Sequence, residues 1–189
     1  MKNLIYIFTI SILFACNTGN KKKVNTENVP IPLSSIYNLT DTFITDNNEP
    51  ITLNKFKNKP TVIGMIFTNC TFACPRLTLD IVDIEKALNT KDVNFVMVSF
   101  DTERDKPEVL KEFHTKMRVN ENWTFLTSHE SAIRKLSILL NVQYEKDGDG
   151  NFSHSNIVSV LDKSGVLVYR KEGLKVNHDE TVKFIKTLL

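Results

Sequence analysis

Two apolar runs separated by a helical stripe constrain this chain more than any other feature. Residues 61–67 read Thr-Val-Ile-Gly-Met-Ile-Phe, and residues 93–100 read Val-Asn-Phe-Val-Met-Val-Ser-Phe. Runs of this kind are typical of strands buried on both faces. The residues between them carry one apolar stripe at helical spacing, formed by Leu77, Ile81, Ile84 and Leu88. Two buried strands joined by a helix predict a right-handed β-α-β unit with parallel strands.

The remaining segments predict how this unit is extended. We expect a hairpin of residues 43–45 and 51–53, a helix opened by a capping box at residues 105–108, a helix over residues 128–140, strands at residues 157–161 and 166–169, and a last helix capped by Asn177. This order is that of a thioredoxin-like fold, an α/β architecture. It has a central mixed β-sheet flanked by helices, here with an N-terminal β-hairpin extension.

Composition narrows the class of protein. Of the 189 residues, 41% are hydrophobic and 24% are charged, which excludes a wholly disordered chain and a polytopic membrane protein. The formal net charge of +2 argues against a dedicated nucleic-acid binder, because such a protein needs a basic face. The length predicts a single domain, which we place at residues 34–189.

The N-terminus has the pattern of an export signal. Residues 1–15 contain one Lys followed by an apolar segment too short to span a bilayer, and a small residue stands just before Cys16. This pattern resembles a bacterial lipoprotein signal peptide with Cys16 as the lipidated residue; an ordinary signal peptide is the alternative. Residues 16–33 then form the lipidated N-terminus and a flexible tether. We therefore expect a protein of the bacterial cell envelope, anchored in the membrane by lipid at Cys16, on the periplasmic side.

Cys70 and Cys74 flank the junction between the first buried strand and the following helix. A helix N-terminus stabilises anions and lowers the pKa of a nearby thiol, so the pair could act as a nucleophile, a redox couple or a ligand pair. A structural disulfide is the alternative, although so short a loop restrains little chain entropy. Three intervening residues let both sulfurs converge on one ion, and thiolates prefer Cu(I) or Zn.

A third ligand is expected from one of four histidines. His154 precedes the strand of residues 157–161 and is the best geometric candidate, because loops at strand ends lie near the active-site edge in such folds. We expect His114 to be half-buried at the surface, and His129, which follows the expected cap Ser128, and His178 to be solvated. Residues 147–151 resemble the start of a calcium loop but lack its required Gly and Glu. We interpret them as the tip of a hairpin ahead of His154.

Three ordered motifs resemble the SCO/SenC family. They are Phe-Thr-Asn-Cys at residues 67–70 with Cys-Pro at 74–75, the segment Ser-Phe-Asp-Thr-Glu-Arg-Asp-Lys-Pro-Glu-Val-Leu at 99–110, and His154 ahead of a strand that ends in Leu-Asp-Lys-Ser-Gly. The resemblance covers roughly residues 34–189. It implies a membrane-anchored, thioredoxin-like protein that binds copper and helps to assemble the copper site of cytochrome c oxidase.

Carried over by motif, Cys70, Cys74 and His154 correspond to the copper ligands of the family, and residues 101–107 to an acidic segment that shapes the site or contacts a partner. Three positions depart from the family pattern. Thr71 stands where Pro is common, Asn69 where His is frequent, and Thr102 where Pro is frequent. None of these departures removes a ligand. They bear on loop stiffness, reduction potential and partner choice more than on metal binding.

The sequence thus predicts a copper chaperone that holds Cu(I) or Cu(II) through a Cys-Cys-His site. Its cysteines are redox-active and can close a Cys70–Cys74 disulfide. The expected partner is the copper-bearing subunit of cytochrome c oxidase or another copper-site protein. The main alternative is a thiol–disulfide oxidoreductase that reduces target-protein cysteines, with Cys70 attacking and Cys74 resolving. A peroxidase and an adhesin with a structural disulfide are weaker alternatives.

Overall fold

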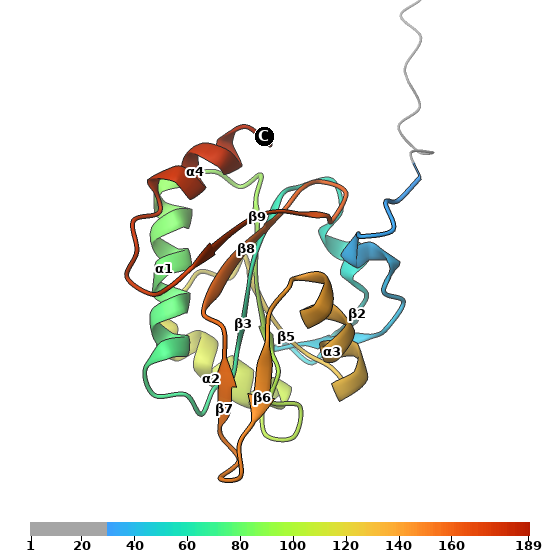
Figure 1. The fold of residues 1–189 in the computed structure, drawn as a ribbon, viewed down its shortest axis with the longest axis vertical. Coiled ribbons are helices and arrows are strands. Elements are labelled where there is room, and N and C mark those ends of the chain that lie inside the picture. Colours follow the sequence, from blue (N-terminus) through green and yellow to red (C-terminus); the bar gives the residue numbers. More distant parts are fainter. Residues whose placement is uncertain (1–29) are drawn as a thin grey trace, which may run out of the picture. The chain divides into compact units, whose positions relative to one another are not determined.

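The structure is a computed structural model that describes residues 30–189. The predicted signal peptide, Cys16 and most of the predicted tether lie outside the described residues. Residues 31–189 form one compact unit, drawn as a ribbon in Figure 1. Within the described part of the chain, no helix is both long and apolar enough to cross a membrane.

A seven-stranded mixed sheet forms the centre of this unit, with strand order β2-β1-β5-β4-β3-β8-β9 (Figure 1). Its strands are β1 (Phe43–Thr45), β2 (Pro50–Ile51), β3 (Thr61–Ile66), β4 (Asn94–Ser99), β5 (Trp123–Thr127), β8 (Ile157–Leu161) and β9 (Leu167–Glu172). β3 is parallel to β4, and β4 to β5. β8 pairs antiparallel with β3 and β9, and β1 pairs antiparallel with β5 and β2. The predicted mixed sheet and N-terminal hairpin are confirmed.

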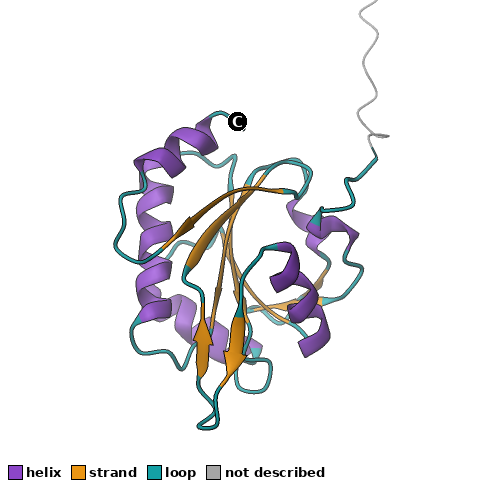
Figure 2. Cartoon of the chain, viewed as in Figure 1, coloured by secondary structure: helices purple, strands orange, loops and turns teal. Residues whose placement is uncertain are grey.

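Four helices flank this sheet, as Figure 2 shows in purple. They are α1 (Ala73–Leu88), α2 (Pro107–Met117), α3 (Glu130–Leu139) and α4 (Asp179–Lys186), and two short 3₁₀ helices, η2 (Ile36–Asn38) and η3 (Leu53–Phe56), precede β3. The predicted stripe of α1 is buried, since its four residues are between 0% and 7% exposed. α1 packs closely on β3 at Gly64, where a side-chain Cβ would lie 3.1 Å from both Ile81 and Met97. Gly64 therefore permits the close approach of the middle of α1 to the middle of β3.

A separate two-stranded hairpin, β6 (Tyr144–Lys146) and β7 (Phe152–His154), projects from the sheet at the bottom of Figure 1. Tyr144 is paired with His154 in its register. The turn at its tip is closed by Asp147, whose amide donates to the carbonyl of Asn151 and whose Oδ1 accepts the amide of Asn151. The prediction that residues 147–151 form a hairpin tip ahead of His154 is confirmed.

Three local predictions, on one strand and two helix N-caps, were wrong. Strand β5 was not predicted, and it supplies the pairing between β4 and the N-terminal hairpin. The N-cap of α2 is Lys106, without a side-chain cap bond, because the carboxylate of Asp105 is engaged elsewhere. The cap of α3 is His129 and not Ser128, since its Nδ1 accepts the amide of Ala132.

Candidate metal centre

The two cysteines lie where β3 gives way to α1. Phe72 is the N-cap of α1, so Cys74 stands in its first turn and is fully buried, whereas Cys70 in the preceding loop is half-buried. The amide of Phe67 donates to the sulfur of Cys74 at 3.4 Å, and the amide of Cys74 donates to the sulfur of Cys70 at 3.3 Å. The cysteines are not joined by a disulfide in this structure. Each sulfur therefore accepts one backbone amide at the junction between β3 and α1.

His154 brings an imidazole to this pair from a distant part of the chain. It is the last residue of β7, and its Nε2 lies 3.7 Å from the sulfur of Cys74. Its ring contacts Phe67 and Phe100, with centroid separations of 5.9 Å and 5.2 Å. The ligand atoms of Cys70, Cys74 and His154 all lie within 4.8 Å of one another, the one such group of three metal-ligating side chains in residues 30–189.

Burial sets the protonation of two of these side chains. It lowers the pKa of His154, an effect that the hydrogen bond with the carbonyl of Ser155 opposes only partly. The imidazole is thereby kept neutral, which is the form that binds metals. Burial also raises the pKa of Cys74 well above its usual range, and the amide of Phe67 offsets part of this rise. Without a metal the Cys74 thiol keeps its proton, so a metal must displace that proton on binding.

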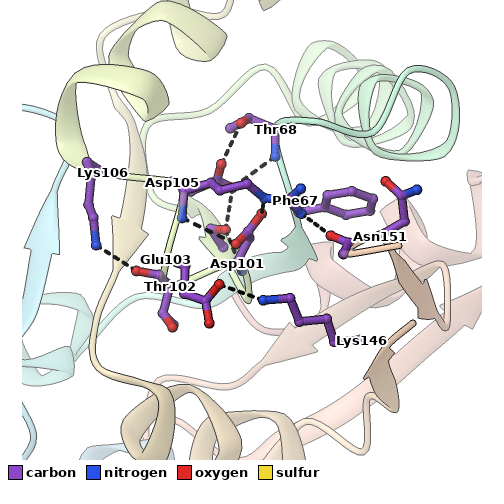
Figure 3. Close-up of polar contacts among 12 residues, drawn as sticks. Phe67, Thr68, Asp101, Thr102, Glu103, Asp105, Lys106, Lys146 and Asn151 are labelled. Atoms are coloured by element: carbon purple, nitrogen blue, oxygen red, sulfur yellow. Dashed lines mark hydrogen bonds and ion pairs between the residues drawn. The ribbon is translucent and has the colours of Figure 1, made fainter. Parts of the chain in front are cut away.

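A buried carboxylate holds the loop that precedes Cys70 (Figure 3). Oδ2 of Asp105 accepts the amide of Thr68 at 2.9 Å and the hydroxyl of Ser99 at 2.5 Å, while Oδ1 accepts the Thr68 hydroxyl at 2.5 Å. Asp105 is 0% exposed. The sequence suggested a helix cap at this position. The parallel strands β3 and β4 end side by side, as the predicted β-α-β unit implies, and this brings Thr68 and Ser99 to Asp105.

The rest of the acidic segment holds the β6–β7 hairpin. Arg104 pairs with the buried carboxylate of Asp101 and donates to the carbonyl of Gly150 at 2.5 Å. Glu103 pairs with Lys146 of β6 at 2.6 Å, as Figure 3 shows. The segment after β4 thus binds two parts of the site. Asp105 holds the loop that precedes Cys70, here called the metal loop, and Arg104 and Glu103 hold the hairpin that carries His154. This arrangement agrees with the expectation that the segment shapes the site.

The other three histidines lie outside this group. His114 is buried and not half-exposed, because its Nδ1 lies 2.7 Å from Oδ2 of Asp46 in a hydrogen bond. The prediction that His178 is solvated is also wrong. Its side chain is 9% exposed, and neither ring nitrogen has a hydrogen-bond partner within the described residues. His129 is 57% exposed, as expected.

The fold and the site together define a thioredoxin-like protein with a Cys-Cys-His centre suited to a soft metal or to thiol redox chemistry. The SCO1/SenC family model matches residues 34–189. The chain therefore belongs to the SCO1/SenC family.

Individual relatives agree with this assignment. The SCO1 protein homolog of Bacillus subtilis is 25% identical over 153 residues, which is 77% of this chain and 79% of that protein. The structure is similar to a SCO1/SenC family lipoprotein from Bacillus anthracis, with a TM-score of 0.72 and 27% identity over 78% of this chain and 91% of that one. It is also similar to copper-bound ScoI of Bradyrhizobium japonicum, with a TM-score of 0.67 and 25% identity over 79% and 97% of the two chains.

Proposed function

We propose that this protein is a copper-binding assembly factor for the copper site of cytochrome c oxidase. The observation that carries the proposal is the convergence of Cys70, Cys74 and His154, three side chains from two distant segments. Two sulfurs and one imidazole form a donor set suited to copper. The copper-bound structure of the Bradyrhizobium relative supports copper as the metal carried.

Each ligand has a distinct task in this proposal. Cys74 is the buried ligand, and its sulfur becomes a thiolate when copper displaces the proton. Cys70 is the more exposed of the two cysteine ligands. His154 supplies a neutral nitrogen and needs no deprotonation. Copper that is handed on leaves behind a pair of thiols able to form a disulfide, so copper loading and thiol oxidation are coupled.

We further propose that lipid at Cys16 anchors the protein on the periplasmic side of a bacterial membrane. The signal pattern of residues 1–15 supports this location. A tether over residues 16–33 would let the folded domain reach a membrane-embedded recipient, such as the copper-bearing subunit of the oxidase. Metabolic labelling with a fatty acid tests the anchor, and the label should be lost in Cys16→Ser.

Copper stoichiometry of the reduced protein tests the central proposal. We expect one copper per wild-type chain and a loss of affinity of at least about 100-fold in His154→Ala, because removing a ligand costs more than removing its supporting partners. His129→Ala is the matched control, since that histidine is exposed and lies outside the site. Unchanged copper binding in His154→Ala would refute the three-ligand site.

A thiol–disulfide oxidoreductase is the second candidate function, favoured by the unequal exposure of the two cysteines. Cys70 is accessible at a helix N-terminus, and Cys74 is buried beside it as a resolving thiol would be. Cys70 would attack a target disulfide, and Cys74 would then close the Cys70–Cys74 bond and release two target thiols. This function predicts target reduction that is unaffected by His154→Ala, with no copper retained by the purified protein.

A further inference from the structure

A polar cleft of about 610 Å³ opens beside His154. Its lining comes from residues 143–145, residues 153–156 and the end of β9 at Glu172 and Gly173. Backbone bonds hold these segments together, since the amide of Ser155 donates to the carbonyl of Gln143 and the amide of Gly173 to that of Asn156. The volume lies in the usual range for binding sites. The cleft is therefore a preformed surface on which a second molecule could bind next to His154.

The charged residues that line this cleft are both acidic. They are Glu145 and Glu172, which are exposed, and neither has a cationic partner within 4.0 Å among residues 30–189. The two neighbouring lysines are already engaged, because Lys146 pairs with Glu103 and Lys171 with Glu180. The cleft thus carries two carboxylates whose charge is not neutralised by an adjacent side chain.

A further nearby cation is also engaged. The ammonium of Lys175 lies 5.8 Å from the centroid of the Phe72 ring, and this lysine is not part of the cleft lining. Such a contact between a cation and an aromatic face is attractive in its own right. The positive charge of Lys175, three residues after Glu172, is therefore directed at an aromatic side chain.

Asn156 also lines the cleft. Its Oδ1 is buried and has no hydrogen-bond donor within the described part of the chain. Because this oxygen is covered, the charged groups that the cleft presents to a ligand are the carboxylates of Glu145 and Glu172. Two exposed anions are complementary to a positively charged ligand.

We propose that this cleft docks a positively charged, extended segment of the protein that exchanges copper or electrons with the Cys70–Cys74–His154 centre. The segment would place lysine or arginine side chains against Glu145 and Glu172. Complementary charges at the edge of a binding site raise the association rate and orient the two proteins more than they add affinity. The identity of the exchange partner rests on the proposed function, but the charge preference of the cleft does not.

Two capped synthetic hexapeptides test the proposal, one with four lysines and one with four glutamates around the same Ser-Gly centre. Each is titrated into the reduced, metal-free protein, and binding is followed by backbone amide NMR. We expect the lysine peptide to shift the amides of residues 153–156 and 172–173 and the glutamate peptide to leave them unmoved. Raising the ionic strength from about 20 to about 200 mM should weaken the lysine peptide severalfold, since exposed charges are screened.

Charge-removing variants locate the binding. Glu145→Gln combined with Glu172→Gln should weaken the lysine peptide about 5-fold, the effect expected for two exposed ion pairs. Glu112→Gln with Glu121→Gln is the matched control, because both glutamates are exposed and lie outside the cleft, and it should bind as wild type does. Equal shifts from both peptides, or an unchanged affinity in the cleft variant, would overturn the proposal. Because no copper is present, a failure of the copper proposal would show separately, in the metal content of His154→Ala.

Discussion

The carboxylate of Asp105 allows a quantitative test of how the metal loop is held. In Asp105→Ala the amide and hydroxyl of Thr68 and the hydroxyl of Ser99 lose their acceptor. Hydrogen bonds to a charged group contribute about 1.5–3 kcal/mol each, and the variant is also relieved of burying a carboxylate that is 0% exposed, which costs several kcal/mol. We expect a net loss of about 3 kcal/mol in the free energy of unfolding.

Copper affinity should fall with this loss of stability although no ligand is removed. Thr68 stands two residues before Cys70, so a freed loop no longer presents the Cys70 sulfur in place. We expect a fall of about 10- to 100-fold in copper affinity, the range seen when supporting partners of a ligand are removed. Chemical denaturation and competition with a copper chelator measure the two effects on the same samples.

The control and the milder variant keep the test decisive. Asp92→Ala removes a carboxylate whose side chain is 77% exposed and paired with Lys59 at 3.8 Å, and it should change the free energy of unfolding by less than about 0.5 kcal/mol. Asp105→Asn keeps an acceptor for the Thr68 amide and should cost about 1 kcal/mol. If Asp105→Ala has the same free energy of unfolding and the same copper affinity as the wild type, the carboxylate does not hold the metal loop.

The pH dependence of this group has a defined sign. Burial raises the pKa of Asp105 in the folded protein, although hydrogen bonds from Ser99 and Thr68 oppose the rise. The folded state therefore binds this proton more tightly than the unfolded state does. Its contribution to the free energy of unfolding falls as the pH rises from the ordinary value of 3.8 through the raised folded pKa. Asp105→Asn should lack this slope, which acid titration of stability would show.

Three further predictions concern reactivity and packing. Iodoacetamide at neutral pH should modify Cys70 well before Cys74, because burial raises the pKa of Cys74 and shields its sulfur. Mass spectrometry of proteolytic peptides would show the order of modification. Gly165→Ala should lower the free energy of unfolding by about 2 kcal/mol, because φ at this position is +79° and a Cβ would lie 2.6 Å from the ring of Tyr37. Equal denaturation midpoints for the variant and the wild type would contradict this prediction. His178→Phe should keep or raise the free energy of unfolding, by up to about 1 kcal/mol, since neither buried ring nitrogen has a hydrogen-bond partner within residues 30–189. A large loss on denaturation would show that the contact between Nε2 and Asp80, at 3.9 Å, is stabilising.

The sequence identified those parts of the site whose positions depend on local pattern. The apolar run of β3, the stripe of α1 and the cysteines between them are contiguous, so spacing placed Cys70 and Cys74 at a strand–helix junction. His154 was placed near them as the histidine ahead of a strand and through the resemblance to the SCO/SenC motifs. The convergence itself depends on the antiparallel pairing of β8 with β3, which local sequence does not encode.

Errors arose where a side chain serves a distant partner. Asp105 has the spacing of a helix cap, yet its carboxylate accepts hydrogen bonds from Thr68 and Ser99 instead of capping α2. His114 sits on an amphipathic helix as a surface residue would, but Asp46 of the N-terminal hairpin covers it. Strand β5 is only five residues long, which is too short for its apolar residues to show a periodicity that identifies a strand. In each case the deciding contact joins segments that are far apart in sequence.

The position of His154 is determined less by its own strand than by a cluster of aromatic rings. Phe100 lies 5.5 Å from Phe67, 5.0 Å from Phe152 and 4.9 Å from Tyr144, measured between ring centroids. The cluster joins the end of β3, the end of β4 and both strands of the hairpin. Aromatic pairs of this kind contribute about 0.5–1.5 kcal/mol each beyond their burial. Because β6 and β7 pair only with each other among residues 30–189, these rings and the polar contacts of Arg104 and Glu103 keep the imidazole beside the sulfurs. Copper affinity and packing at this end of the sheet are therefore coupled, and substitutions in the cluster should weaken metal binding without touching a ligand.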